Sequence, residues 1–287
     1  MHNHINQFKQ TEQLRIEVVE LNNIYVKETA PSTTDQSILL EHLGETFKAT
    51  SNLKLKNNTN KTIEKLVFSL NDGLKISSFK LNGNETSFLR EKHLVIVSDN
   101  INFEPGSAAE VEFMYEGNIN EALCYLDIDE KTMQEKYGTF VINVDKRFAF
   151  ITSEYVLLTP EANWYPKTGV TFSSEDVSWH QQQFINFNLK VKTTGGLKAV
   201  SQGKINEISA GEFTFENEHP LTQVSLAIGN YKLQKIESDS IEFGLWALEG
   251  HGIPEDALPE IKDTIKSIIT ERFGDFQRKY NLEYSFN

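Results

Sequence analysis

The sequence is poor in cysteine, in basic residues and in long apolar runs, and each shortage excludes a class of protein. A single cysteine, Cys124, rules out an intrachain disulfide and a metal site built from several cysteines. The 28 Lys and Arg residues stand against 41 Asp and Glu residues, so the formal net charge is -13. Because nucleic-acid binding depends on basic residues that release counterions, we expect no nucleic-acid partner. No window approaches the roughly 18 consecutive apolar residues of a membrane-spanning helix, so we expect no direct membrane insertion.

Motifs that would carry catalysis are also missing. A zinc peptidase holds its metal with His-Glu-x-x-His, and no two of the seven histidines have that spacing. A Gly-x-Ser-x-Gly nucleophile elbow and the glycine-rich phosphate and dinucleotide loops are absent. The acidic residues Asp127, Asp129 and Glu130 lack the spacing of a calcium loop and favour a solvated surface. We therefore expect no catalytic residue, no metal ligand and no cofactor in this chain, which is then not an enzyme by itself.

Apolar and polar residues alternate over most of the chain, as they do in half-buried β-strands. The alternation is strict from Val111 to Tyr115 and from Ile185 to Val191. Turns such as Asn71-Asp72-Gly73 supply residues that tolerate positive φ. The predicted fold class is mainly β, a large antiparallel saddle or sandwich of many short strands. Strands are predicted over residues 14–18, 47–55, 65–70, 74–81, 94–97, 111–115, 139–144, 148–156, 184–192, 198–202, 212–216, 222–228 and 241–248, with a loop over 29–36 and a short helix over 130–136.

One long amphipathic helix is predicted near the C-terminal end. Pro259 fits the first turn of a helix, and apolar residues then recur at spacings of three and four. This stripe must pack against the sheet of this domain or against a domain that follows. It consists of Ile261, Ile265, Ile268, Ile269, Phe273, Phe276 and Tyr280. We divide the chain into a frayed N-terminal segment over residues 1–13, a β domain over 14–250, and the helix with the start of a linker over 251–287.

The stretch from Leu158 to Pro166 is the best candidate for recognition. It holds two prolines, two adjacent aromatic residues and one carboxylate within nine residues. Glu161 could meet a cationic group beside the aromatic walls of Trp164 and Tyr165. The alternative is a turn with these aromatic residues packed beneath it. The candidate substrate-binding residues are Glu161, Thr159, Trp164 and Tyr165.

Six motifs follow one another between Thr159 and Tyr231. They are Thr159-Pro160-Glu161-Ala162, Tyr165-Pro166, the strand Phe184 to Lys192, Gly196-Leu197-Lys198-Ala199-Val200-Ser201-Gln202-Gly203, Gly211-Glu212-Phe213-Thr214-Phe215 and Leu226-Ala227-Ile228-Gly229-Asn230-Tyr231. In this order and spacing, the stretch resembles the N-terminal domain of the gluzincin zinc aminopeptidases, of the aminopeptidase N and leukotriene hydrolase type.

The resemblance implies a β saddle that covers the peptide cleft of a zinc-bearing catalytic domain located beyond Asn287. It implies that Glu161 holds the free amino group of a peptide, so the expected partners are that catalytic domain and peptide N-termini. Thr159 replaces the glutamine of the family pattern, and Lys167-Thr168-Gly169 replaces Cys-Phe-Asp. The arginine that precedes the aromatic-Pro pair is missing as well. The parent protein would be a metallo-aminopeptidase or a degenerate relative, with zinc in its catalytic domain.

Two sequence segments point to a smaller group within this family. Tyr165-Pro166-Lys167-Thr168-Gly169 and Val177-Ser178-Trp179 look most like divergent bacterial members fused to ABC-type permease helices. This similarity implies a soluble segment of a membrane-associated parent, on a side of the membrane that the sequence does not reveal. The alternative function, from another class, is a stand-alone β-sandwich adhesion or carbohydrate-binding module. That alternative predicts exposed aromatic residues in a groove and a natural stop near Asn287.

Overall fold

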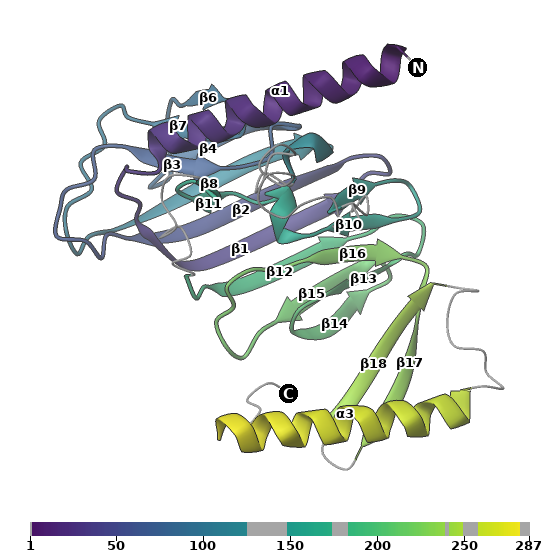
Figure 1. Cartoon of the computed structure of the whole chain (residues 1–287). Helices are drawn as coiled ribbons and strands as arrows, with labels where there is room; N and C mark the ends of the chain where they lie inside the picture. The colour runs from purple at the N-terminus through teal and green to yellow at the C-terminus, as the bar shows by residue number, and fades with distance from the viewer. Residues whose placement is uncertain (1, 125–147, 174–182, 239–240, 249–257, 282–287) are drawn as a thin grey trace.

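The computed structural model describes residues 2–124, 148–173, 183–238, 241–248 and 258–281, and these form several β-sheets with a long helix near each end (Figure 1). The helices are α1 (His2–Tyr25) and α3 (Leu258–Tyr280), with two short 3₁₀ helices, η1 (Glu121–Leu123) and η2 (Pro160–Ala162). The mainly β fold class and the long C-terminal helix are both confirmed.

The largest sheet has eight strands in the order β14-β15-β12-β1-β2-β8-β4-β5. Its strands are β1 (Ser32–His42), β2 (Phe47–Lys56), β4 (Leu74–Leu81), β5 (Asn84–Glu85), β8 (Ala108–Gly117), β12 (Asn186–Lys192), β14 (Lys204–Ser209) and β15 (Glu212–Glu216). Neighbours are antiparallel except β1 and β12, which run parallel with Ile38 opposite Leu189. This parallel pair joins two halves of the sheet that lie far apart in the sequence.

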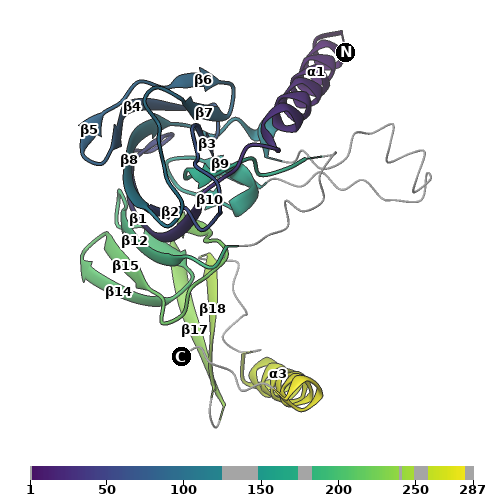
Figure 2. The ribbon, with the colours of Figure 1, turned by 90° about the vertical axis from the view of Figure 1, so that its left-hand side faces the viewer.

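Two four-stranded sheets pack on one face of the large sheet, which curves around them (Figure 2). One contains β13 (Lys198–Ser201), β16 (Leu226–Gly229), β10 (Val156–Leu158) and β9 (Ala149–Ile151), and the other contains β11 (Lys167–Thr168), β3 (Leu66–Ser69), β7 (Leu94–Val97) and β6 (Leu89–Glu91). Phe113 of the large sheet meets Phe68 of β3 and Phe79 of β4 at centroid distances of 5.2 and 4.9 Å. Such edge-to-face contacts are typical of a close-packed aromatic core.

Strands β3 and β7 are buried at every position because they lie between two layers. Phe68 and Val95 face the main core, whereas Val67 and Ile96 face a second cluster beneath α1. Alternate side chains of a strand point to opposite faces, so a strand covered on both faces reads as an unbroken apolar run. The helix α1 therefore forms an outer layer of the body.

The strand predicted over residues 14–18 was wrong, because residues 2–25 form α1. The frayed terminus over 1–13 stays a prediction. Residues two apart share one face of a strand, but here Val18 is buried and Ile16 is 46% exposed. This burial pattern excludes a strand and fits a helix. His93 donates its Nε2–H to Asn22 Oδ1 at 2.7 Å, and Lys92 pairs with Glu17. These tertiary contacts favour a helix over a strand in this segment.

The loop predicted over residues 29–36 was also wrong from Ser32 onward, because β1 begins there. Gln36 is buried, and its Nε2 donates to Ser51 Oγ and to the carbonyl of Pro166, both at 3.0 Å. Polar side chains with partners can occupy a central strand that an apolar pattern does not reveal. The strand predicted over 148–156 is divided between β9 and β10 by a turn at Thr152. The strand predicted over 139–144 and the helix over 130–136 lie outside the described residues.

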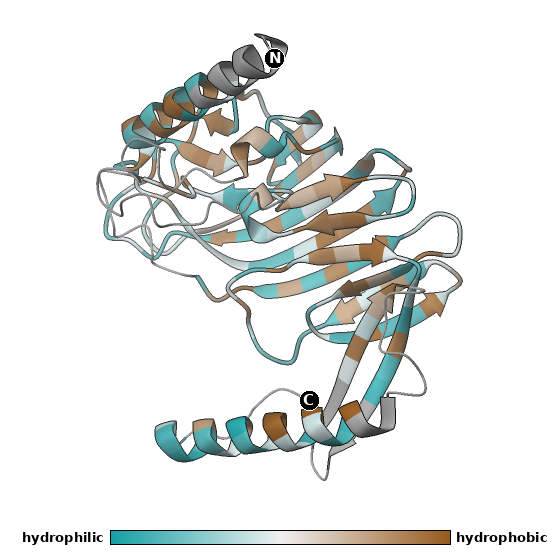
Figure 3. Cartoon of the chain, turned by 45° about the vertical axis from the view of Figure 1, so that its right-hand side comes forward, coloured by the Kyte–Doolittle hydropathy of each residue, from teal (hydrophilic) through white to brown (hydrophobic). Residues whose placement is uncertain are grey.

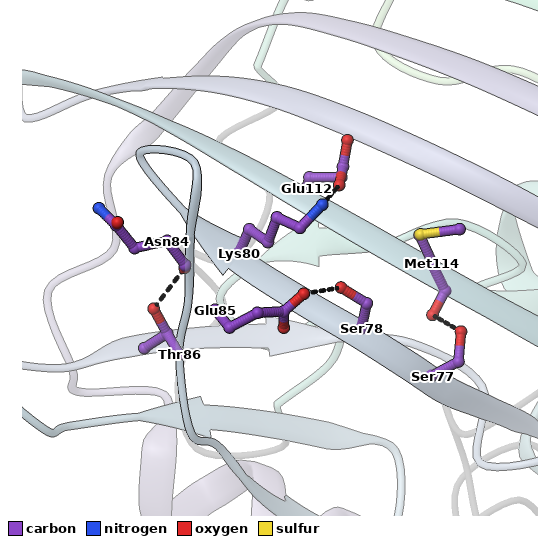
Figure 4. A network of polar contacts seen from close by, with 8 residues as sticks. All are labelled: Ser77, Ser78, Lys80, Asn84, Glu85, Thr86, Glu112 and Met114. Atoms are coloured by element: carbon purple, nitrogen blue, oxygen red, sulfur yellow. Dashed lines mark hydrogen bonds and ion pairs between the residues drawn. The ribbon is translucent and has the colours of Figure 1, made fainter.

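The outer face of the large sheet carries interleaved charged and polar side chains (Figure 4). Lys80 of β4 pairs with Glu112 of β8 at 2.8 Å, and Ser78 donates to Glu85 at 2.7 Å. Ser77 donates to the carbonyl of Met114 beside the register shift between Ile76 and Ser78. The sheet thus has one core face and one solvated face, as antiparallel sheets commonly do.

The strands β17 (Tyr231–Ser238) and β18 (Ile241–Leu248) form a separate two-stranded sheet that carries α3 away from the body (Figures 1 and 2). We call these three elements the end unit. Figure 3 shows hydrophobic segments recurring along α3. None of residues 261–281 is buried, and Ile268 and Phe276 are 54% and 62% exposed. The predicted helix is confirmed, but its apolar stripe does not pack on the large sheet.

Candidate functional site: the Pro160–Ala162 turn

The turn predicted around Glu161 is a single 3₁₀ turn, η2, between β10 and β11. Thr159 precedes it in an extended conformation, and Pro160 occupies the first position, where its restricted φ fits a helical turn. Asn163 closes it in the left-handed region with φ 47° and ψ 44°, which asparagine tolerates better than most residues. Pro160 and Ala162 are buried, whereas Glu161 is exposed. The turn thus presents one carboxylate to solvent.

The two aromatic residues after the turn lie in the core. Trp164 is fully buried and Tyr165 is 1% exposed. Their rings meet edge to face at 4.7 Å, and Tyr165 packs in the same way on Phe187 of β12 at 5.7 Å. The Tyr165 hydroxyl accepts a hydrogen bond from the backbone N–H of Val224. The structure therefore matches the alternative in which the aromatic residues pack beneath the turn, and of the four candidate residues only Glu161 is exposed.

A buried asparagine clamps the turn to two other segments. Asn71 Nδ2 donates to the carbonyls of Ala162 at 3.0 Å and Asn120 at 3.2 Å. Its Oδ1 accepts from the backbone N–H groups of Gly73 at 3.0 Å and Asn120 at 2.8 Å. Its own N–H donates to the carbonyl of Asn163 at 2.9 Å. Sequence reasoning treated Asn71 only as part of a turn, because nothing local reveals partners so far along the chain.

Gly73 lets these segments approach closely. A Cβ atom at Gly73 would lie 2.2 Å from the carbonyl oxygen of Asn118, closer than two non-bonded atoms can come. Glycine lacks this atom, so the backbones of the two segments can pass each other directly. Residues 71–73, 118–124 and 159–167 therefore meet at one place, which we call the loop junction.

Carboxylates from all three segments of the loop junction surround one thiol. Burial, together with the nearby carboxylates of Glu121, Glu161 and Asp72, raises the pKa of Cys124 to about 12. The thiol is therefore neutral near pH 7 and unsuited to nucleophilic chemistry. The negative groups make the junction attractive to a cation and unattractive to an anion.

Lys167 supports the turn from the side. Its Nζ donates to the carbonyl of Pro160 at 2.6 Å and lies 5.2 Å from the centre of the Tyr165 ring. Burial lowers the pKa of Lys167 to about 8, and Glu161 opposes that shift through its negative charge. Among the described residues, the Glu161 side chain forms no hydrogen bond or ion pair. Its carboxylate is therefore available to a cationic partner.

The described ranges contain neither a metal site nor a membrane-spanning helix. Within them, no group of three or more His, Cys, Asp or Glu side chains is placed to hold a metal ion. No helix among the same residues is long and apolar enough to cross a membrane.

Comparisons with solved structures show in which proteins a fold like that of this chain occurs. The M1 zinc metallopeptidase from Deinococcus radiodurans matches with a TM-score of 0.54 and 13% identity over 79% of this chain and 50% of that chain. A mutant M1 zinc metallopeptidase from the same organism, bound to a Tyr-Ser-Ala substrate, matches with a TM-score of 0.54 and 12% identity over 83% of this chain and 52% of that chain.

A mutant two-domain M1 zinc metallopeptidase bound to L-tryptophan matches with a TM-score of 0.54 and 13% identity, over 79% of this chain and 51% of its own. The present chain thus has the fold of part of these proteins and spans about half of their length. No protein-family model matches the sequence, and no curated protein matches it either.

Proposed function

We propose that this chain is the non-catalytic N-terminal domain of an aminopeptidase-like zinc metallopeptidase, which covers a peptide cleft and docks on a catalytic domain beyond residue 287. The observation that carries the proposal is the structural match, which spans about half of M1 zinc metallopeptidase chains. The zinc would belong to the catalytic domain, and no described residue of this chain is assigned to it. The bacterial, membrane-associated parent stays a prediction.

The end unit supports the docking part of the proposal. A two-stranded sheet alone is marginally stable, and an amphipathic helix normally buries its apolar stripe. Here Ile268, Phe276 and Tyr280 of α3 are each more than half exposed, and Leu233 and Leu245 of the hairpin are each 37% exposed. A catalytic domain in the same parent chain is the partner that would cover these side chains without paying the entropy of association between separate molecules.

Glu161 supports the part of the proposal that concerns peptides. A carboxylate that accepts hydrogen bonds from an ammonium group forms one of the stronger polar contacts. Asn71 holds the backbone of Ala162, the residue after Glu161, and the buried rings of Trp164 and Tyr165 fix the next part of the chain. We assign Glu161 to the α-amino group of a bound peptide. Thr159, Trp164 and Tyr165 would then act as positioning residues for the turn.

The test begins with the reading frame after Asn287, translated over roughly three hundred residues, which is the usual scale of one or two domains. We expect His-Glu-x-x-His with a later glutamate and, in the full-length protein, aminopeptidase activity on peptides with a free N-terminus. Glu161→Gln should lower kcat/KM by about tenfold or more, since a hydrogen bond to a charged group contributes about 1.5–3 kcal/mol. Glu154→Gln, at an exposed position on the preceding turn, is the matched control and should leave kcat/KM unchanged.

Two results would contradict the proposal. A frame that stops near Asn287, or continues without zinc ligands, removes the catalytic partner. Equal activity of the Glu161→Gln and Glu154→Gln proteins in an active enzyme would remove the amine-binding role while leaving the docking role intact.

One observation fits the alternative, a stand-alone β-sandwich adhesion or carbohydrate-binding module. That class predicts an exposed aromatic side chain in a groove, and Phe184, which is 70% exposed, lines a hollow on the body.

A further inference from the structure

A hollow of about 840 Å³ lies where the C-terminal end of α1 meets the first residues of β1 and β12 and the strand β11. Its wall combines hydroxyl and amide side chains with one exposed ring. The residues that matter for its chemistry are Thr29, Ser32, Asn58, Thr168, Gln183 and Phe184.

The lining of the hollow is polar but almost without charge. Among its described lining residues the only ionisable acid or base with a charge at neutral pH is Glu28, and Lys65 neutralises it through a contact of 2.6 Å. A phosphate or other anion would find no free cation in this lining, and a cationic ligand would find no unpaired carboxylate. The chemistry therefore favours a neutral ligand that offers both hydrogen-bond donors and acceptors.

Part of the wall is rigid and part is free to bind. Gln183 Oε1 accepts from the Thr33 N–H at 2.7 Å, and the hydroxyls of Thr33 and Thr168 lie 3.3 Å apart, so these groups hold one another in place. Within the described part of the chain, the side chains of Thr29 and Asn58 form no hydrogen bond. Ser32, at the start of β1, is in the same situation. These three side chains can exchange water for ligand hydroxyls without breaking a protein contact.

Phe184 supplies an apolar platform on a fixed backbone. The next residue, Ile185, exchanges two backbone hydrogen bonds of 2.9 Å with Leu221 and packs against the core. Because side chains alternate along an extended segment, anchoring Ile185 inward turns the Phe184 ring outward, where it is 70% exposed. The face of an aromatic ring carries partial negative charge and attracts the slightly positive C–H groups of a ligand.

We propose that this hollow binds a neutral oligosaccharide. A sugar ring offers hydroxyls that both donate and accept, which matches serine, threonine and asparagine, and an apolar C–H face, which matches Phe184. A peptide recognised through its main chain would need an open strand edge, and β11, which borders the hollow, is only two residues long. The inference does not rest on the proposed function, since the hollow and the Glu161 turn involve different side chains.

The test is titration of the whole chain with short neutral oligomers of cellulose, starch and chitin, followed by calorimetry and by saturation-transfer NMR of the sugar. We expect at least one oligomer to bind with a dissociation constant of about 1 mM, a value typical of a small site with few contacts. Phe184→Ala should weaken that binding about tenfold, which corresponds to roughly 1.4 kcal/mol. The matched control is Phe276→Ala, because Phe276 is similarly exposed but lies on α3.

Each other outcome would overturn the proposal. No binding of any oligomer, or equal binding by the Phe184→Ala and unaltered proteins, excludes a saccharide site at this hollow. Binding that Phe276→Ala weakens equally places the contact elsewhere or makes it nonspecific. Thermal melting of both variants checks that each is folded. A capped neutral tripeptide that binds in a Phe184-dependent way, with no sugar bound, would assign the hollow to peptides.

Discussion

The loop junction and the end unit both contain large aromatic side chains, but these side chains differ in how far they are buried. At the loop junction, Trp164 is fully buried and Asn71 is bonded to three segments. In the end unit, Phe276 is 62% exposed, and no residue of α3 between 261 and 281 is buried. Burial of apolar surface is the main source of folding free energy. Among the described residues, the loop junction therefore gains folding free energy from burial, whereas the apolar side chains of α3 gain little.

The largest expected effect comes from truncating one aromatic residue in each region. Trp164→Ala should lower the free energy of unfolding by about 4 kcal/mol, because it leaves a large cavity in a core that cannot fully collapse. Phe276→Ala should change it by less than about 0.5 kcal/mol, as exposed substitutions usually do. Urea denaturation followed by circular dichroism measures both. A comparable loss from Phe276→Ala would mean that the end unit is already well packed in this chain.

The next effect sharpens the role of the asparagine clamp. Asn71→Ala removes two donors and leaves the N–H groups of Gly73 and Asn120 without their acceptor. We expect a loss of about 3 kcal/mol in the free energy of unfolding, since unpaired buried polar groups are costly. Asn84→Ala is the control, because Asn84 is exposed on the short strand β5, and it should have little effect. Equal midpoints of urea denaturation for the two variants would show that the clamp contributes nothing.

The smallest effect, for a change of one pH unit, is a pH response of the body. Burial, with smaller contributions from Arg90 and Lys92, lowers the pKa of His93 from 6.5 to about 3. Between these values the unfolded chain binds a proton that the folded chain does not, so stability is lost as the pH falls from 6.5 towards 3. The free energy of unfolding should change by about 1 kcal/mol per pH unit in this window. His93→Gln should flatten the dependence, and denaturation at a series of pH values measures it.

The matched control for the pH response is Phe276→Ala, which should keep the profile of the unaltered chain. If His93→Gln leaves the pH dependence of the free energy of unfolding unchanged, other groups dominate the acid sensitivity. The contact between His93 and α1 would then not be its cause.

Local patterns predicted a large part of the fold. The strict alternation from Val111 to Tyr115 falls within β8, and the apolar stripe of residues 261–280 falls within α3. These patterns are reliable because side-chain direction repeats every two residues in a strand and about every 3.6 in a helix. The turn around Glu161 was predicted chiefly from its two prolines, whose backbone preferences act within a few residues.

Other features could not be predicted because their causes lie far away in the sequence. The polar strand β1 depends on Gln36 reaching Ser51 and Pro166. The helix α1 depends on the surface formed by β3 and β7, against which Leu21 and Tyr25 pack. In both cases tertiary contacts override weak local propensities.

By itself, the sequence determined the β-rich class, the amphipathic C-terminal helix and the single carboxylate of the turn, since each follows from side-chain period or from backbone preference over a few residues. Only the tertiary structure decided that Trp164 and Tyr165 lie beneath that turn, that Asn71 clamps it, and that the stripe of α3 stays uncovered. The physical reason is that burial depends on which distant segments come together, and those contacts have no fixed separation along the chain.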